Sequence, residues 1–349
     1  MEFLDLFSGI GGFRRGLERS GHKCVGHVEI DRHANTSYAA MYGLVPCKYE
    51  RGGEENCCRM CRKEVSRHCD GNQCKGEWFA KDIKQLTAGE VPRAEIWTFG
   101  FPCTDISLSG KRAGLAGERS GLFFTVAGLL KGTPAEDRPQ ILIVENVKHL
   151  LSSKGGGDFT AVLLNLWEAG YDLEWQCVDS RDFGVPQHRE RVYLVGHFGG
   201  IRGSEVFPVC GTDTAAVKET IGDRGGALPH GEVLCIREAT KRGYAVARHG
   251  DGINLSYPNS RLRRGRVGKQ CSQTLLTSDS MGVLVHGRIR RLTPREYFRL
   301  QAFDDFLFDR ARAAGVSDAQ LYKQAGNSVT VNIVYEIGKR LAEMEAVNR

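Results

Sequence analysis

The stretch that decides the fold is Phe3-Leu4-Asp5-Leu6-Phe7-Ser8-Gly9-Ile10-Gly11-Gly12. Its first half is a short apolar run typical of a buried strand, and its second half is a glycine turn. Glycines allow the backbone to approach a ligand closely, and the following residues, 13–20, are a predicted helix whose first N–H groups have no helical partner. A strand that passes through a glycine turn into a helix is typical of a nucleotide-binding α/β domain.

An acid in the right place supports this interpretation. Glu29 lies at the end of the next predicted strand, residues 23–30, where such domains place a carboxylate for ribose hydroxyls about 20 residues beyond the turn. The glycine spacing is G-x-G-G rather than the G-x-G-x-x-G of dinucleotide sites. The turn therefore favours an adenosyl ligand without phosphates over NAD, which leaves an NAD-dependent oxidoreductase and a purely structural glycine turn as the alternatives.

The rest of the chain alternates strands with helices. Strands are predicted at residues 95–99, 140–144 and 191–196, and helices at 122–131 and 159–170. The run Gln140-Ile141-Leu142-Ile143-Val144 is apolar without interruption, as in strands that are buried on both faces of a parallel sheet. This order predicts an α/β fold with a doubly wound, mostly parallel sheet, and a length of 349 residues predicts a second, smaller domain.

The second domain is expected where the composition changes. Residues 199–291 contain 15 Lys and Arg against 8 Asp and Glu, a surplus larger than the net charge of +6 for the whole chain. Such a segment is typical of a phosphate-binding surface, or else of a solvated basic face. A helix start at Thr293-Pro294 and a final helix over 329–344 mark the return to α-structure. We expect domains at 1–197, with a cysteine-rich insertion at about 47–78, at 198–290, and a return to the first domain over 291–349.

Two reactive side chains follow predicted strands. Cys103, in Phe99-Gly100-Phe101-Pro102-Cys103, comes directly after the strand at 95–99, and Glu145 ends the strand at 140–144. Ligands bind at the carboxyl edge of such sheets, so we expect a nucleophile and a general acid at one site. A packing cysteine and a helix-capping carboxylate are the alternatives.

A third element is Gln187-His188-Arg189-Glu190-Arg191. Alternate residues of an extended segment point the same way, so Gln187, Arg189 and Arg191 are predicted to share one face. Two arginines directed at one site indicate anchoring of a carboxylate or phosphate, or else an exposed ladder of charges.

Taken together and in this order, these elements resemble the DNA (cytosine-5)-methyltransferase family of bacteria and phages. The resemblance covers Phe3 to Val195 and Arg291 to Ile337, including Arg299-Leu300-Gln301 and Gln324-Ala325-Gly326-Asn327-Ser328-Val329. The sequence departs from the family in having Thr104 where Gln is usual and Lys81 before Asp82 where Gly is common. The family implies a Rossmann-like, S-adenosylmethionine-dependent catalytic domain with a smaller target-recognition domain. It also implies methyl transfer to carbon 5 of a flipped-out cytosine in a specific duplex sequence, through a covalent bond between Cys103 and C6.

The resemblance assigns roles to named residues. The catalytic set is Cys103, Glu145, Asn146, Arg189 and Arg191. The cofactor-binding set is Asp5, Phe7, Ser8, Gly9, Ile10, Gly11, Gly12, Glu29, Ile30, Asp82, Ile83, Pro102, Asn327, Ser328 and Val329. Expected DNA contacts are Ser107, Lys111, Gln187, Arg261, Arg263, Arg264, Arg266 and Lys269.

Two other functions fit the same motifs: an RNA (tRNA) cytosine-5 methyltransferase and a non-catalytic DNA-binding member of the fold. The basic segment favours DNA, and the complete catalytic set favours an enzyme. Expected partners are double-stranded DNA, on which the protein acts as a monomer, and a companion restriction endonuclease. The sequence lacks a secretory signal and any apolar run of about 20 residues, so we expect a cytoplasmic protein with no membrane partner.

Six of the 12 cysteines lie in one short segment. Cys58, Cys61, Cys69 and Cys74 have spacing close to that of structural zinc sites, with Cys47 and Cys57 as alternative ligands. The other interpretation is an insertion with reduced thiols.

Overall fold

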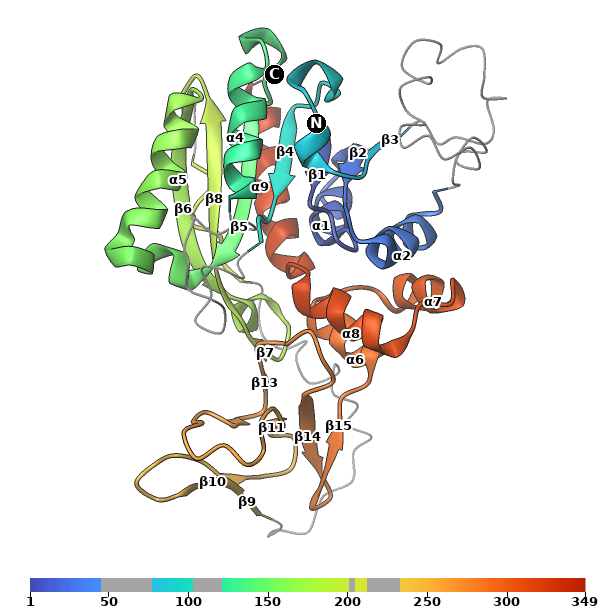
Figure 1. Ribbon diagram of the computed structural model, residues 1–349, viewed down its shortest axis with the longest axis vertical. Coiled ribbons are helices and arrows are strands. Elements are labelled where there is room, and N and C mark those ends of the chain that lie inside the picture. Colours follow the sequence, from blue (N-terminus) through green and yellow to red (C-terminus); the bar gives the residue numbers. More distant parts are fainter. Residues whose placement is uncertain (45–76, 103–120, 201–204, 212–232, 349) are drawn as a thin grey trace. The chain divides into compact units, whose positions relative to one another are not determined.

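The computed structural model describes residues 1–44, 77–102, 121–200, 205–211 and 233–348 (Figure 1). The chain divides into two compact units. The first consists of residues 1–178, 191–209 and 334–349, and the second of residues 179–190 and 210–333. Each unit is therefore built from separate stretches of sequence.

The first unit contains a seven-stranded sheet. Its strands, in spatial order, are β3 (Trp78–Ala80), β2 (Lys23–Val28), β1 (Glu2–Leu6), β4 (Ile96–Phe99), β5 (Ile141–Val147), β8 (Glu190–Phe198) and β6 (Tyr171–Asp179). The first five are parallel, and β8 runs antiparallel to β5. The strand order reverses between β1 and β4, which is the point where open α/β sheets bind ligands. The predicted doubly wound, mostly parallel sheet is confirmed.

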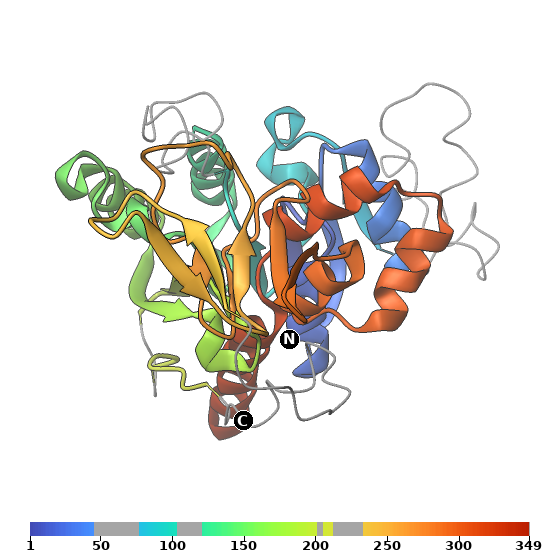
Figure 2. The same cartoon turned by 90° about the horizontal axis from the view of Figure 1, so that it is seen from below.

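Helices cover both faces of this sheet (Figures 1 and 2). They are α1 (Gly12–Arg19), α2 (Arg32–Tyr42), α4 (Leu122–Gly132), α5 (Gly157–Glu168) and α9 (Val331–Asn348). Leu4 and Leu6 of β1 join one core cluster with Phe123 and Val126 of α4. The strand alternates its side chains, so its other residues face the opposite side, where α1 and α9 meet. There the Nε2–H of His22 donates to the carbonyl of Gly338 at 2.9 Å.

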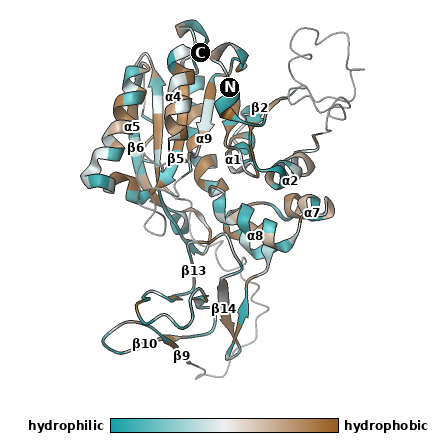
Figure 3. Cartoon of the chain, viewed as in Figure 1, coloured by the Kyte–Doolittle hydropathy of each residue, from teal (hydrophilic) through white to brown (hydrophobic). Residues whose placement is uncertain are grey.

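Short 3₁₀ turns link several of these elements. They lie at Ile83–Gln85, Ala88–Glu90, Ala135–Asp137, Lys148–Leu151, Ser153–Gly156 and Ser180–Phe183. Figure 3 shows hydrophobic residues concentrated on α4 and along the central strands, as expected for a sheet buried on both faces. Among the described residues, no helix is both long and apolar enough to cross a membrane.

In the part of the second unit that the structure describes, short strands are combined with helices (Figure 2). An antiparallel pair joins β9 (Leu234–Arg237) to β10 (Tyr244–Ala247), and a four-stranded sheet has the order β12 (Val267–Gly268), β11 (Gly252–Asn254), β14 (Met281–Val285) and β15 (Arg288–Arg291). Strand β7 (Gln187–His188) pairs in parallel with β13 (Ser272–Gln273). The helices are α6 (Pro294–Leu300), α7 (Asp305–Ala313) and α8 (Asp318–Asn327).

The predicted helix start at Thr293 is confirmed. The Thr293 hydroxyl accepts a hydrogen bond from the backbone N–H of Glu296, and the Glu296 carboxylate accepts one from the N–H of Thr293. This reciprocal cap, with Pro294 in the first turn, satisfies donors that a helix start otherwise leaves unbonded.

Candidate active site

The glycine turn after β1 is held open by its backbone conformation and by Glu29. Gly9 and Gly11 have φ angles of +56° and +78°, which favour glycine because an added Cβ would crowd the backbone. The Glu29 carboxylate accepts hydrogen bonds from the N–H groups of Gly9 (2.8 Å) and Asp31 (2.7 Å). Burial raises the pKa of Glu29. Each carboxylate oxygen has a second lone pair, so Glu29 retains the capacity to accept hydroxyl donors.

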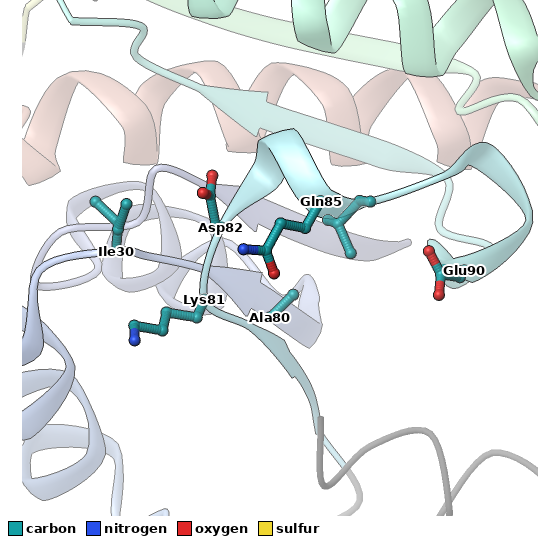
Figure 4. Close-up of a pocket in the computed structure, with 7 residues that line it drawn as sticks. Ile30, Ala80, Lys81, Asp82, Gln85 and Glu90 are labelled. Carbon is teal, nitrogen blue, oxygen red and sulfur yellow. The ribbon is translucent and has the colours of Figure 1, made fainter. Parts of the chain in front are cut away.

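A pocket of about 170 Å³ lies beside this acid (Figure 4). Its lining includes Ile30, Ala80, Asp82 and Gln85. Ile30 is 63% exposed, which is unusual for a large apolar side chain that follows a buried strand. The Asp82 carboxylate accepts from the N–H of Lys84 (3.0 Å) and so shapes the 3₁₀ turn at one wall. The pocket combines apolar and acidic groups, which suits a nucleoside.

Two buried oxygen atoms near the turn have no hydrogen-bond partner among the described residues: Asp5 Oδ2 and Ser8 Oγ. Asp5 is fully buried at the end of β1, and its other carboxylate oxygen accepts from the Thr98 hydroxyl at 3.0 Å. Burial raises the pKa of Asp5 to about 8, although the Thr98 hydrogen bond lowers it. Buried polar atoms are normally bonded, so these two fit a ligand with polar donors.

The carboxyl ends of β4 and β5 bring the catalytic candidates together. The pairing of Phe99 with Val144 places Gly100 beside Glu145, and a Cβ at Gly100 would lie 3.3 Å from Glu145 Oε2. The side-chain amide of Asn146 donates to the carbonyl of Phe101 at 3.1 Å. The structure therefore places Glu145 and Asn146 against the two residues that lead to Pro102 and the predicted nucleophile.

An ion pair completes this part of the site. Arg191 Nε lies 2.9 Å from Glu145 Oε1, and both side chains are nearly buried, with 13% and 12% of their surfaces exposed. Strand β8 positions Arg191 because Val147 and Arg191 are paired in the antiparallel ladder. A guanidinium in this place fixes the carboxylate and compensates its charge.

Arg189 has different partners. It is buried, and its guanidinium donates to the carbonyls of Gly326 (3.3 Å) and Ser328 (2.8 Å) in the second unit. Arg189 thus ties Gln187-His188-Arg189 to the segment that contains Asn327. These contacts hold Arg189 against backbone carbonyls within the second unit.

Gln301 belongs to a motif that the sequence brings into the resemblance, but the sequence assigns it no role. It is buried, and its side-chain amide donates to the carbonyls of Ala325 (2.8 Å) and Ser328 (3.1 Å). Its own side-chain oxygen accepts from the Thr330 hydroxyl at 2.9 Å. The only local signal for this role was a glutamine directly after the apolar end of a helix. Its hydrogen-bond partners lie more than 20 residues away in the sequence, so the local pattern could not identify them.

The prediction that Gln187 contacts DNA is not supported by its placement. Gln187 is fully buried, its amide donates to the carbonyl of Leu300 at 2.9 Å, and its oxygen accepts from the N–H of Leu275 at 3.0 Å. A fully satisfied, buried side chain holds strands and helices together within the second unit.

The same correction applies to Arg266. This residue is 3% exposed, and its guanidinium donates to the carbonyls of Ser256 (3.2 Å) and Tyr257 (2.5 Å). Lys269 donates to the carboxylate of Asp251 at 2.9 Å, although its side chain remains 63% exposed. Arg266 therefore shapes the loop that precedes it and is not available to a phosphate.

The loop that Arg266 supports is exposed. Arg261 and Arg264 are exposed, Leu262 is 89% exposed, and the Arg263 guanidinium lies 5.4 Å from the centre of the Tyr257 ring. Cationic and aromatic side chains on one exposed loop are typical of nucleic-acid surfaces.

Several predicted site residues lie outside the described residues. They are Cys103, Ser107, Lys111, and the cysteines Cys47, Cys57, Cys58, Cys61, Cys69 and Cys74. Within the described residues, no group of three or more His, Cys, Asp or Glu side chains could hold a metal.

Comparison with known proteins agrees with this geometry. The family model described as C-5 cytosine-specific DNA methylase matches residues 1–55 and 72–343. The chain is 31% identical to the Type II methyltransferase M.DsaV of Dactylococcopsis salina, over 98% of this chain and 86% of that protein. It is also 31% identical to the Type II methyltransferase M.NlaX of Neisseria lactamica, over 99% and 98% of the two chains.

Solved structures share the fold. The Entamoeba histolytica methyltransferase EhMeth aligns with a TM-score of 0.64 and 16% identity, covering 99% of this chain and 98% of that one. A putative DNA modification methyltransferase from an E. coli prophage aligns with a TM-score of 0.61 and 18% identity over the whole of both chains. The resemblance predicted from the motifs is confirmed. The chain belongs to the C-5 cytosine-specific DNA methylase family.

Proposed function

We propose that this protein transfers the methyl group of S-adenosylmethionine to carbon 5 of a cytosine in duplex DNA, with Cys103 as the covalent nucleophile. The observation that carries the proposal is the Glu145–Arg191 ion pair, which lies against Gly100 at the end of the strand that leads to Cys103. A buried carboxylate fixed beside the residues that lead to a cysteine nucleophile suits the activation of a pyrimidine ring.

The residues around the glycine turn fit the cofactor. When bound, S-adenosylmethionine supplies an electrophilic methyl group on its sulfonium. Glu29 would accept the ribose hydroxyls, Ile30 and Asp82 would line the adenine side, and the unbonded oxygens of Asp5 and Ser8 would accept from the amino-acid end. The remaining proposed cofactor contacts are Phe7, Gly9, Ile10, Gly11, Gly12, Ile83, Pro102, Asn327, Ser328 and Val329.

The proposed chemistry follows from the low nucleophilicity of carbon 5 of cytosine. Carbon 5 is a weak nucleophile in the aromatic ring, and addition of the Cys103 thiolate to C6 moves the electrons of the C5–C6 double bond toward C5. Glu145 would donate a proton or hydrogen bond to N3, so that this ring nitrogen can take up the electron density that the addition displaces, while Arg191 holds the carboxyl group in place. After C5 has gained its methyl group and the cofactor has left as the neutral thioether, a base from solvent would take the C5 proton; the electrons of that C–H bond restore the C5–C6 double bond and expel the Cys103 thiolate.

The target base has to leave the helix for these groups to reach it. Flipping costs a few kcal/mol, which contacts to the DNA must offset. Residues 198–290 are proposed to supply the recognition surface, with Arg261, Arg263 and Arg264 as contacts and Lys269 at its margin. Ser107 and Lys111, which lie outside the described residues, are proposed as further DNA contacts.

Methyl incorporation tests the function directly. Purified protein with labelled S-adenosylmethionine is expected to label duplex DNA and not tRNA, and bisulfite sequencing of DNA from producing cells should show 5-methylcytosine in one sequence context. Label in tRNA alone would support the RNA alternative, and binding of DNA without any label would support the non-catalytic one.

Two arginines of the same basic run, Arg261 and Arg266, should behave differently. Arg261→Ala is expected to weaken duplex binding and to reduce the salt dependence of log K by about 0.9, the effect of one lost phosphate contact. Arg266→Ala should instead lower the free energy of unfolding by about 2–4 kcal/mol, because it removes a buried side chain and leaves the buried carbonyl of Asn254 and the partly buried carbonyls of Ser256 and Tyr257 without donors. Fluorescence anisotropy at several salt concentrations and thermal unfolding measure the two effects. Reversal of the pattern would contradict the assignment.

We also propose one structural zinc in the cysteine-rich segment, on the spacing of Cys58, Cys61, Cys69 and Cys74. Elemental analysis of purified protein should find about one zinc per chain, and substitution of Cys58 and Cys61 by serine should remove it. The alternative, an insertion with reduced thiols and no metal, predicts no zinc and six thiols in this segment that react with a chromogenic reagent, in addition to the exposed Cys177, Cys210 and Cys235.

The proposals also concern the partners of the protein and its location in the cell. Relatives are named Type II methyltransferases, which supports the proposal of a companion restriction endonuclease with the same target sequence. We propose that the protein acts as a monomer on DNA, in the cytoplasm of a bacterial cell. Sedimentation with and without a target duplex would test the first of these.

A further inference from the structure

Arg14 lies between the two ends of the cysteine-rich segment. Tyr42, the last residue of α2, precedes the six clustered cysteines of this segment, and Glu77 follows them. The Arg14 guanidinium forms a two-pronged ion pair with Glu77, at 2.7 Å and 2.8 Å, and lies 4.1 Å from the centre of the Tyr42 ring. One side chain of α1 therefore contacts residues on both sides of residues 43–76.

Tyr42 in turn contacts the glycine turn. Its hydroxyl donates to the carbonyl of Gly11 at 2.8 Å. Gly11 has a φ angle of +78°, and a Cβ there would lie 2.6 Å from the Tyr42 ring, so the ring fits tightly against the back of the turn. Glu29 binds the N–H of Gly9 in the same turn. The turn is thus held at Gly9 by Glu29, the proposed acceptor for the ribose hydroxyls, and at Gly11 by Tyr42.

These contacts depend on one another because they are buried. The Arg14 side chain is 6% exposed and that of Glu77 is 15% exposed. A desolvated guanidinium requires a carboxylate to compensate its charge, and the paired geometry fixes its plane. With that plane fixed, the guanidinium packs against the Tyr42 ring and restricts the ring to the orientation that reaches Gly11. Arg14 has further partners in Glu18 (2.8 Å) and the Tyr38 hydroxyl (3.3 Å).

We propose that Tyr42, Arg14 and Glu77 are positioning residues for the cofactor, and that they set its affinity by holding the glycine turn in its binding shape. None of the three is assigned to the cofactor by the motifs, and Glu77 acts only through Arg14. The inference rests on the proposed use of S-adenosylmethionine. It also links the cysteine-rich segment to the cofactor site, because Tyr42 and Glu77 lie on either side of that segment.

Conservative substitutions test the chain of contacts. Tyr42→Phe keeps the ring and its packing on Arg14 but removes the hydrogen bond to Gly11. Its dissociation constant for S-adenosylmethionine, measured by calorimetry on the full-length protein, is expected to rise about five- to tenfold. KM for the cofactor should rise in parallel, while kcat at saturating cofactor stays within about twofold, since the variant affects binding of the cofactor and not the chemistry on the base.

Tyr171→Phe is the matched control. The Tyr171 hydroxyl is buried and donates to the carbonyl of Pro139 at 2.8 Å, in β6 at the edge of the same sheet. This variant loses the same kind of hydrogen bond away from the turn, and its cofactor affinity should be unchanged even if its Tm falls. Equal cofactor affinities for Tyr42→Phe and Tyr171→Phe would overturn the inference.

A double-mutant cycle tests the role of Arg14. Glu77→Gln should weaken cofactor binding about threefold or more in the unaltered protein, and by less in the Tyr42→Phe background, because both variants release the same contact. Arg14→Lys should resemble Glu77→Gln, since lysine keeps the charge but loses the paired geometry. If the effects of Glu77→Gln and Tyr42→Phe on the free energy of cofactor binding were strictly additive, the proposed coupling between these residues would be overturned. An unaltered protein that binds no S-adenosylmethionine would overturn the proposed function and this inference together.

Discussion

Replacement of Cys103 by alanine is expected to lower the rate of methyl transfer by at least about 10⁴-fold, the scale seen when a covalent nucleophile is removed. Without the thiolate, C6 gains no fourth substituent and C5 stays part of the aromatic ring, so the methyl acceptor does not form. Duplex DNA should still bind within about threefold of the unaltered affinity, because alanine removes only one small side chain from the interface. Labelled methyl incorporation and fluorescence anisotropy measure the two quantities.

The control for this variant is Cys177→Ala. Cys177 is an exposed cysteine on β6, and its loss should leave methyl transfer unchanged. A duplex that carries 5-fluorocytosine at the target should form a covalent complex with the unaltered protein, detectable by mass spectrometry on the peptide that contains Cys103, and none with Cys103→Ala. Residual activity above a few per cent in Cys103→Ala would contradict the covalent mechanism.

The second large effect is expected at Glu145. Glu145→Gln should lower kcat by about 10²- to 10⁴-fold, the range for a positioned general acid. Glutamine has nearly the same shape and can still contact Arg191, but it cannot transfer a proton to N3 of the base. The single-turnover rate with saturating DNA and cofactor isolates this step from binding.

Glu168→Gln is the corresponding control. Glu168 lies on the surface of α5 and pairs with Lys131 at 2.6 Å, and such exposed pairs contribute little to stability. This variant should keep the single-turnover rate of the unaltered protein. If Glu145→Gln lowered only the affinity for DNA and left that rate intact, Glu145 would be a binding residue and not the acid.

The sequence predicted the sheet well because its strands carry strong local signals. The turn at Gly9–Gly12 and the apolar run at 140–144 marked β1 and β5, and parallel strands then place their carboxyl ends at one edge. Glu145 and Asn146 lie beside Gly100 and Phe101 for this reason alone. The short strands of the second unit gave no such signal, because two to five residues are too few for a clear alternation.

What the sequence could not provide were contacts between distant positions. Arg266 and Lys269 look alike in a basic run, yet Arg266 is buried against carbonyls and Lys269 is 63% exposed. Gln187 and Gln301 are ordinary polar residues until their partners are known. The change of composition near residue 199 marked the start of the β-rich segment, and the sequence predicted that residues 291–349 return to the first domain. In the structure, helices α6 to α8 group instead with the β-rich segment in the second unit.

The hydrogen bond between His22 and Gly338 joins residues that are 316 positions apart, and this separation affects how the protein folds during its synthesis. While the chain is still emerging from the ribosome, β1 and α1 exist without the helix that covers them, so their apolar surface stays exposed until α9 has been made. The part of the sheet around β1 and α1 therefore cannot complete its packing before the C-terminal helix has been synthesised. A prematurely terminated product should therefore be a substrate for chaperones and proteases, and not a smaller working enzyme.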